Sequence, residues 1–175
     1  MADESFNDLK KRSAQAGQIE WIGLCTERRG AVRSVESAMV RERTGLDGDH
    51  HAVNGSSKRQ VTLIQAEHLP VIASLTGRDN VSPKMLRRNI VVSGINLLSL
   101  KDQKFRLGEA LLEGTAPCVP CSRMEEVLGT GGYNAMRGHG GLCARVLEAG
   151  AVNVGDSVTM VIEEPEGEDE QPTLF

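Results

Sequence analysis

Aromatic residues are scarce in this chain. They make up 3% of its 175 residues, and Phe6 and Phe175 stand near its ends. Trp21, Phe105 and Tyr133 are the only aromatic side chains of the Phe, Trp and Tyr types in between. A core must therefore be built mostly of Val, Ile, Leu, Ala and Met. The length is enough for one domain with short appendages.

Long apolar runs are also missing. No segment approaches the roughly 18–20 consecutive apolar residues of a transmembrane helix. The first residues are acidic and contain no apolar stretch of the kind found in a signal peptide. We therefore expect no membrane association and a cytoplasmic protein. Its four cysteines should be reduced, which argues against a disulfide scaffold.

The segment 163–175 contains no Lys or Arg, and it holds six of the Asp and Glu residues of the chain. The net charge is −4, so the rest of the chain carries a charge of +2. A body this weakly basic does not favour direct nucleic-acid binding, and we expect none. Of its 20 basic residues 14 are arginines, whose planar guanidinium suits the recognition of phosphate and carboxylate groups. A local anion site is therefore compatible with the composition.

Short apolar segments separated by Gly-containing turns dominate the chain before residue 163. They are typical of a β-barrel or sandwich, and regular β-α-β alternation is absent. Strands are expected at residues 19–26, 31–40, 60–64, 90–93, 104–107, 110–113, 142–148 and 157–162, and helices at 67–75, 83–87 and 122–128. Residues 41–55 should form a loop, residues 129–141 a flexible Gly-rich loop, and Ile19 and Trp21 should share a face. We predict a mainly β fold, a closed or partly open barrel with a few short peripheral helices.

Three parts are expected along the chain: a flexible N-terminal arm or frayed helix at 1–17, the barrel domain at 18–162 and an acidic disordered tail at 163–175. The tail contains no apolar anchor before Leu174, and such a composition favours disorder. Its last five residues, Gln171 to Phe175, resemble the short Gln-x-x-Leu-Phe peptides that bind the bacterial DNA sliding clamp. A contact with the clamp is one hypothesis, and a chance match is the other.

The sharpest chemical signal is the pair Cys118 and Cys121. Cys121 precedes a predicted helix and lies close to Arg123, and both features favour a thiolate. Four interpretations stay open. The two cysteines can pack as small apolar residues; they can belong to a zinc site, although a second CxxC is missing; they can form a redox pair; or Cys121 can act as a single thiolate with Cys118 as an accessory.

Further polar residues surround this pair in the sequence. The candidates for binding an anion are Arg87, Arg88, Asn89, Arg123, Arg137 and His139, together with Lys84. Glycines on both sides of residues 133–137 allow backbone N–H groups to approach a ligand, although no Walker sequence is present. A solvated arginine face is the alternative. The string from Asp47 to His51 can bind a hard metal, but an Asp-Gly turn explains it more simply.

Seven segments in this order resemble the MOSC family, named for the C-terminal domain of molybdenum cofactor sulfurase. They are GLDGDH at 45–50, RQVTLI at 59–64, RRNIVVSG at 87–94, GEALLE at 108–113, PC at 120–121, GGLCARVLE at 140–148 and VGD at 154–156. The resemblance covers about residues 19–162 and implies a barrel like that of pyruvate kinase.

The resemblance also implies a site. Cys121 corresponds to the family's cysteine, which ligates molybdenum in members that bind the molybdenum cofactor or carries sulfur as a persulfide. Arg87 or Arg88, with Asn89, corresponds to residues that hold the pterin phosphate of molybdopterin. The implied activities are reduction of N-hydroxylated compounds and sulfur transfer, with a sulfur donor or electron-transfer protein as partner.

Two further expectations follow from the same comparison. The pyridoxal-phosphate domain of the full-length sulfurase and its Schiff-base lysine are missing here, so no pyridoxal phosphate should be bound through a Schiff base. The alternative to an enzyme or sulfur carrier is a non-enzymatic ligand-binding or interaction module that retains the fold, with a tail that docks on a partner.

Overall fold

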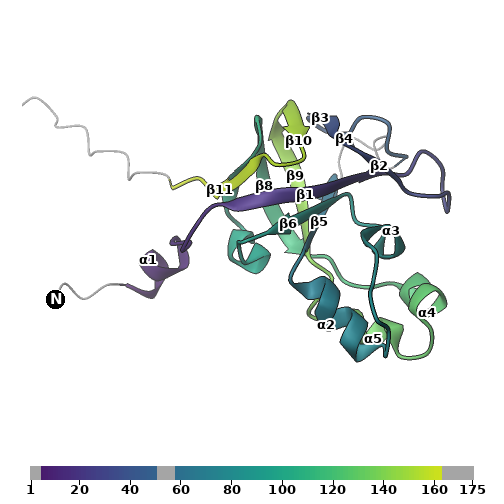
Figure 1. The fold of residues 1–175 in the computed structure, drawn as a ribbon. Coiled ribbons are helices and arrows are strands. Elements are labelled where there is room, and N and C mark those ends of the chain that lie inside the picture. The colour runs from purple at the N-terminus through teal and green to yellow at the C-terminus, as the bar shows by residue number, and fades with distance from the viewer. Residues whose placement is uncertain (1–4, 51–57, 163–175) are drawn as a thin grey trace, which may run out of the picture.

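Seven strands close into a barrel at the centre of the molecule (Figure 1). The structure is a computed structural model, which describes residues 5–50 and 58–162. Around the barrel the strands follow in the order β1 (Gly17–Leu24), β6 (Ile90–Ser93), β5 (Val61–Gln65), β9 (Leu142–Glu148), β8 (Ala110–Pro117), β7 (Lys104–Leu107) and β11 (Ser157–Met160). β11 pairs with β1 and closes the ring. The predicted fold class is confirmed.

The barrel interior is aliphatic, as the shortage of aromatic residues requires. Strand alternation places Ala110 and Leu112 inside, while Leu111 between them faces outward. Phe105 is the one fully buried aromatic ring among the described residues, and it stands opposite Leu112 in the β7–β8 pair. A short strand, β2 (Arg33–Val35), extends the sheet beyond β1.

One crossover interrupts the antiparallel pattern. β5 and β6 run parallel, and the chain between them forms α2 (His68–Leu75) and α3 (Pro83–Leu86). Both helices were expected, and α3 begins with Ser82 and Pro83 as predicted. It ends one residue early because Arg87 takes a left-handed conformation, with φ of 57°. This crossover carries the chain over the outer face of the barrel.

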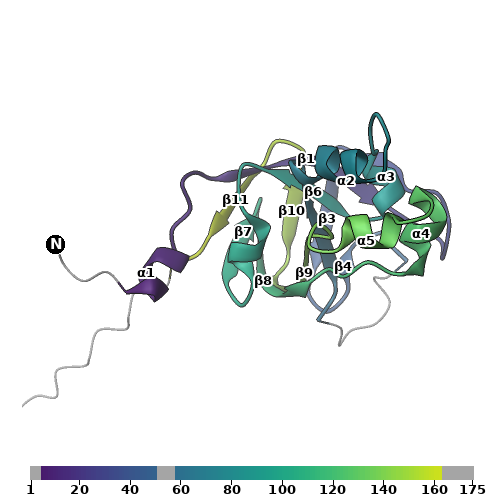
Figure 2. The same ribbon diagram turned by 90° about the horizontal axis from the view of Figure 1, so that it is seen from below.

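A layer of helices covers that outer face. α2 and α3 are joined there by α4 (Ser122–Leu128) and α5 (Gly132–Met136). Figure 2 shows these four at one end of the molecule and α1 (Phe6–Lys10) at the other. Their apolar side chains pack on Ile64 and Val91, which point out of the barrel and form a second core distinct from its interior.

The Gly-rich segment 129–141 is not a continuous flexible loop, and this expectation was wrong. It contains α5, whose Met136 is fully buried in the second core. The Glu125 carboxylate accepts hydrogen bonds from the backbone N–H groups of Gly131 and Tyr133 at 2.8 and 2.9 Å. These bonds lower the pKa of Glu125 and satisfy donors at the start of α5 that have no helical partner.

The expected shared face of Ile19 and Trp21 was also wrong. The pairing of β1 with β6 shifts register between these two residues, so one extra residue is accommodated there. Ile19 therefore lies in the barrel interior, while Trp21 packs on the helical layer. The ring of Trp21 lies over Gly23, where a Cβ atom would approach it within 2.0 Å.

Three further strands form a small second sheet. They are β3 (Ser37–Arg41), β4 (Gly45–Leu46) and β10 (Gly150–Asn153), in the order β10-β3-β4. β10, β4 and the short 3-10 helix η1 (Leu97–Leu100) were not expected. The prediction that 41–55 is all loop fails at β4, where Leu46 is buried because the barrel needs an apolar cover there.

Residues 1–4, 51–57 and 163–175 lie outside the described part of the chain. His51, the acidic tail and the clamp-like segment from Gln171 to Phe175 fall in these ranges. The three-part division of the chain and the contact with a sliding clamp therefore stay predictions.

Two glycines allow a test of backbone constraint. Gly141 has φ of +89°, and a Cβ atom there would lie 1.9 Å from the Leu63 carbonyl oxygen, whereas Gly138 has φ of +80° and open space. Gly138→Ala should cost about 1 kcal/mol, from conformational strain alone. Gly141→Ala should cost about 3 kcal/mol or more, because β5 must also move. Equal losses in urea unfolding would contradict this account.

Candidate functional site

Asp49 anchors the end of β1. The turn at Gly48, with φ of +83°, brings its buried carboxylate to the backbone N–H of Cys25, which donates to Oδ2 at 3.1 Å. His50 binds the same residue, through its backbone N–H and through Nδ1, at 2.8 and 2.9 Å from the Cys25 carbonyl oxygen. Among the described residues, which exclude His51, no group of three or more His, Cys, Asp or Glu side chains could hold a metal ion.

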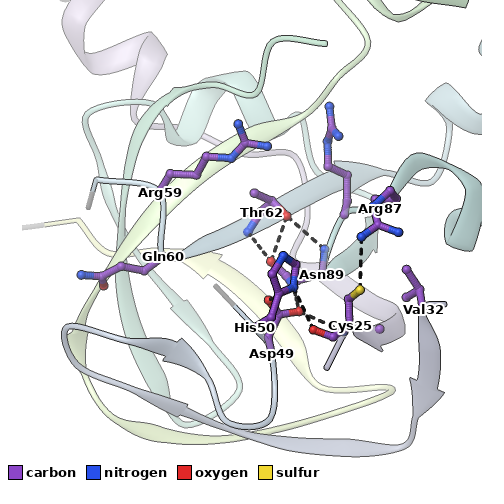
Figure 3. A pocket seen from close by; sticks show the side chains of 11 residues that line it. Cys25, Val32, Asp49, His50, Arg59, Gln60, Thr62, Arg87 and Asn89 are labelled. Carbon is purple, nitrogen blue, oxygen red and sulfur yellow. Dashed lines mark hydrogen bonds and ion pairs between the residues drawn. The ribbon is translucent and has the colours of Figure 1, made fainter. Parts of the chain in front are cut away.

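Asn89 ties three segments together (Figure 3). Its Oδ1 accepts hydrogen bonds from the Thr62 backbone N–H and hydroxyl at 3.0 and 2.9 Å, and its Nδ2 donates to Asp49 Oδ2 at 3.0 Å. The Asn89 amide therefore has protein partners on both of its polar atoms. In this structure it positions β5 and the Asp49 turn relative to each other.

These residues line a small polar hollow of about 40 Å³. Arg59, Arg87 and Arg88 line it as well, together with Asp49. Figure 3 shows Arg87 reaching Cys25 at one side and Arg59 extending over the other. A space of this size admits a few water molecules or one small anion.

Arg87 is held by its unusual backbone. The left-handed conformation turns its side chain to the β1–β2 connection, where Nη1 donates to the Gly30 carbonyl oxygen at 2.8 Å. Nη2 lies 3.2 Å from the Cys25 sulfur.

Arg88 points the opposite way and is 4% exposed. Its Nε donates to the Gly140 carbonyl oxygen at 2.9 Å, Nη1 to Leu86 at 2.9 Å and Nη2 to Cys118 at 3.4 Å. Burial lowers its pKa and the neighbouring Cys118 raises it. An arginine stays protonated under these conditions, so a fixed positive charge stands behind the cysteine segment.

Three of the four cysteines gather around this charge. Cys118 is buried after β8, Cys143 is buried in β9, and Cys121 is exposed as the N-cap residue of α4. All four cysteines are free. Cys118, Cys143 and Cys121 each interact electrostatically with the Arg88 guanidinium. Cys25 instead stands beside Arg87.

Cys118 and Cys143 share one negative charge. A hydrogen bond from the Cys143 thiol lowers the pKa of Cys118, burial opposes this, and Arg88 and Arg59 add to the lowering. The same hydrogen bond and burial raise the pKa of Cys143. The lowered pKa of Cys118 and the raised pKa of Cys143 have one cause, because the two thiols titrate as a pair. The first proton leaves the pair more readily than usual, and the second leaves less readily. We assign the thiolate to Cys118, which receives the hydrogen bond.

Arg87 and Arg123 line a second, larger hollow between α3, α4 and the β1–β2 connection. It measures about 380 Å³, and Arg29 and Lys84 line it too. We call it the basic hollow. The Nε atom of Arg123 is buried without a hydrogen-bond partner, and its Nη1 lies 4.0 Å from Glu126, at the limit of an ion pair. Arg123 also stands two residues from Cys121.

Arg137 and His139 stand apart from the basic hollow. Arg137 is exposed and lines an apolar hollow of about 280 Å³ with Leu98, Tyr133 and Cys118. The ring of His139 packs edge-on against His68 with 5.0 Å between centroids. Burial, and then His139, lowers the pKa of His68. The structure thus divides the predicted anion-binding residues among the small polar hollow, the basic hollow and this apolar hollow with its neighbouring histidine pair.

Sequence reasoning missed Arg59, Cys25 and Cys143 as members of the site. Cys143 carried a usable signal, because Leu142 and Ala144 on either side of it are apolar and point into the barrel. Alternation then puts Cys143 on the outer face, beside its β5 partner Thr62. Cys25 and Arg59 gave no signal, since only the folded chain brings them to Arg87 and Arg88.

The fold and the site together define a mainly β barrel protein whose outer face is rich in thiols and arginines. The family model of the MOSC domain matches residues 47–159. The chain belongs to the MOSC domain family, whose members are associated with the molybdenum cofactor. No curated protein sequence matches it significantly. No helix among the described residues is long and apolar enough to cross a membrane.

Solved structures with the same fold include the YuaD protein from Bacillus subtilis, at 20% identity and a TM-score of 0.72, covering 82% of this chain and 94% of that one. YiiM from Geobacillus stearothermophilus shares 18% identity with a TM-score of 0.69, covering 83% and 75%. YiiM from Escherichia coli shares 19% identity with a TM-score of 0.65, covering 84% and 71%. At these identities the likeness concerns the fold.

The thiol pair predicts a pH dependence. Thiolate absorbance at 240 nm should show one cysteine ionising well below its ordinary pKa near 9, and Cys118→Ala should remove that step. Because the pKa of Cys118 is lower in the folded than in the unfolded chain, the unfolded chain binds more protons between the two values. The free energy of unfolding should therefore rise with pH up to about 8.5.

Cys25→Ala is the matched control for this titration, because Cys25 lies at the other arginine. It should leave the early step in place. A single titration of all cysteines near pH 8.5–9, or an early step that survives Cys118→Ala, would contradict the assignment.

Proposed function

We propose that this chain binds a phosphorylated cofactor of the molybdopterin class, with the phosphate in the basic hollow and the Cys121 sulfur at the reacting end. One observation carries the proposal. Arg87 and Arg123, from two different helix ends, line one hollow with Arg29 and Lys84. Arg123 is two residues from the exposed Cys121 in the sequence. The family membership of the chain supports the same cofactor class.

The residues present fit such a group. Four cations in one hollow match the charge of a phosphate, and the partnerless Nε of Arg123 is a buried donor without an acceptor. Buried polar atoms in proteins are nearly always paired, so an orphaned donor of this kind favours a bound acceptor. Two of the predicted phosphate ligands take other roles in this proposal, because all three guanidinium nitrogens of buried Arg88 and both polar side-chain atoms of Asn89 bind protein groups. Arg87 binds Gly30 and Cys25 through Nη1 and Nη2 and keeps further N–H donors for a phosphate.

The bound cofactor supplies a redox-active molybdenum centre. The chain's own residues hold and orient it. Arg87 and Arg123 bind the phosphate, and Cys121 offers a sulfur ligand from the N-cap position of α4. Arg88 fixes the preceding segment through the Cys118 carbonyl and is a positioning residue. The proposed chemistry, reduction of an N-hydroxylated compound, requires an electron-transfer partner.

A second candidate function is sulfur transfer, with Cys121 as a persulfide carrier that receives sulfur from a donor protein. The exposure of Cys121 favours this candidate, because a donor must reach the thiol directly. A cytoplasmic location, where thiols stay reduced, belongs to both versions of the proposal. The two versions share the same residues and differ in whether metal is retained.

Molybdenum and pterin content should separate them. We expect protein purified from a host that makes the cofactor to contain both, and Cys121→Ser to lose the metal. Arg123→Ala and Arg87→Ala should each weaken cofactor binding by about tenfold or more, the usual effect of losing a charge-assisted hydrogen bond. Arg106→Ala is the matched control, because Arg106 pairs with Glu148 on the barrel and should bind normally.

A persulfide assay tests the second candidate. After treatment with glutathione persulfide, mass spectrometry should find the added sulfur on Cys121, and Cys121→Ser should abolish it while Cys118→Ser retains part. Equal loss from both changes would show that the cysteines act as a pair. If the wild type binds neither cofactor nor sulfur, the domain is a non-enzymatic binding module.

A further inference from the structure

Cys118 and Cys143 have no part in cofactor binding as proposed, yet the two thiols interact, since Cys143 lowers the pKa of Cys118. The backbone brings them together. Cys118 N–H donates to the Gly141 carbonyl oxygen at 2.8 Å, two residues before Cys143. The pairing of β8 with β9 sets Ala116 opposite Cys143 and Pro117 opposite Leu142, so Cys118 lies diagonally across the two strands from Cys143.

A fixed positive charge faces both thiols. The Arg88 guanidinium donates to the carbonyl oxygens of Leu86, Gly140 and Cys118, which leave it no freedom to move away. Arg59 adds a second cation near the pair. Cations stabilise the thiolate, the form that attacks a disulfide.

A reagent in solution reaches Cys118 and Cys143 less readily than it reaches Cys121. Cys118 is 2% and Cys143 6% exposed, so a molecule the size of glutathione cannot reach either sulfur directly. Cys121 is exposed, lies three residues from Cys118 and interacts with the same guanidinium. All three thiols thus interact with one arginine, Cys121 from the surface and Cys118 and Cys143 from the interior.

We propose that Cys121, Cys118 and Cys143 form a thiol–disulfide exchange site, whose substrate is a low-molecular-weight disulfide and whose oxidised product is a disulfide between Cys118 and Cys143. Cys121 is the entry point and the buried pair stores the oxidation. This activity needs no metal or cofactor, and it goes beyond the function proposed above, with which it shares Cys121.

The exchange takes place in three steps, in each of which one S–S bond forms and another breaks. The Cys121 thiolate attacks a disulfide RSSR, forms a mixed disulfide with one RS group and releases RS⁻. The Cys118 thiolate then attacks the Cys121 sulfur, forms a Cys118–Cys121 disulfide and releases the second RS⁻. Cys143 attacks the Cys118 sulfur, and the Cys121 thiolate leaves and takes up a proton. Two protein thiols are oxidised, and RSSR is reduced to two thiols.

The test uses the full-length protein without cofactor, incubated with glutathione disulfide and then digested without reduction. We expect two of the four thiols to be lost and a peptide cross-linked through Cys118 and Cys143 to accumulate. Cys143→Ala should stop at a Cys118–Cys121 disulfide. Cys118→Ala should stop at a mixed disulfide of glutathione with Cys121.

Cys121→Ala is the sharpest variant, because the side chain is exposed and its loss should leave the fold intact. It should slow the formation of the buried disulfide at least tenfold. Cys25→Ala is the matched control and should react like the wild type. Thermal unfolding of each variant identifies any that fails to fold, and the wild type and Cys121→Ala then decide alone.

Three results would overturn the proposal: four thiols that survive in the wild type, a cross-link that includes Cys25, or a buried disulfide that forms at the wild-type rate in Cys121→Ala. Each leaves the cofactor proposal untouched, because molybdenum and pterin content are measured on separate, reduced samples. Cofactor loss with normal exchange would conversely overturn only the proposed function.

Discussion

The hydrogen bonds of one buried arginine organise the outer face of this barrel. Arg88 binds carbonyl groups at the end of α3, in the segment after β8 and in the turn before β9. Three elements far apart in the sequence are thereby fixed around one charge. Removing a buried, fully paired charge of this kind exposes its partners to an apolar interior, which typically costs about 3–5 kcal/mol. Without that charge, the carbonyl oxygens would face each other unpaired.

The chemistry of the face follows from the pairing of sulfur with guanidinium groups. Cys25 lies against Arg87, while Cys118 and Cys143 lie against Arg88 and Arg59. Two adjacent arginines point in opposite directions because Arg87 adopts a left-handed backbone and Arg88 does not. A single irregular residue thus divides the cations between the basic hollow and the thiol cluster. Both places gain a positive charge that neither could hold through its local sequence alone.

Much of the architecture was predictable from local patterns. Apolar alternation gave β7, β8 and β9, and Ser82 with Pro83 marked the start of α3. Errors arose where a long-range partner decides the outcome. The extra residue between Ile19 and Trp21 is set by pairing with β6, and α5 depends on the Glu125 carboxylate and on the pocket that receives Met136. No local pattern carries that information.

Prediction of the site from the sequence also failed where contacts between distant residues decide the arrangement. Cys121 and Arg123 were found because they are close in the sequence, and the family resemblance added Arg87 and Asn89. Their surroundings could not be read in this way, because Cys143 reaches the face through strand pairing with Thr62, and Cys25 meets Arg87 across 62 residues. Arg59 likewise lines the polar hollow only once the barrel has formed. The roles of Arg88 and Asn89 depend on which backbone groups they meet, and a sequence does not specify those contacts until the barrel closes.

The closure of the barrel by β1 and β11 has a consequence for how the chain can be cut and rejoined. The first and last barrel strands are hydrogen-bonded neighbours, at Gly17 opposite Val158 and Gln18 opposite Ser157. A short linker between them would complete a covalent ring with little rearrangement. New ends could then be opened in an exposed turn such as that between Leu107 and Ala110, giving a circular permutant with the same strand order in space. The helices α2 to α5, with Cys121 at the N-cap of α4, lie at the other end of the molecule, so such a permutant would carry them unchanged (Figure 2).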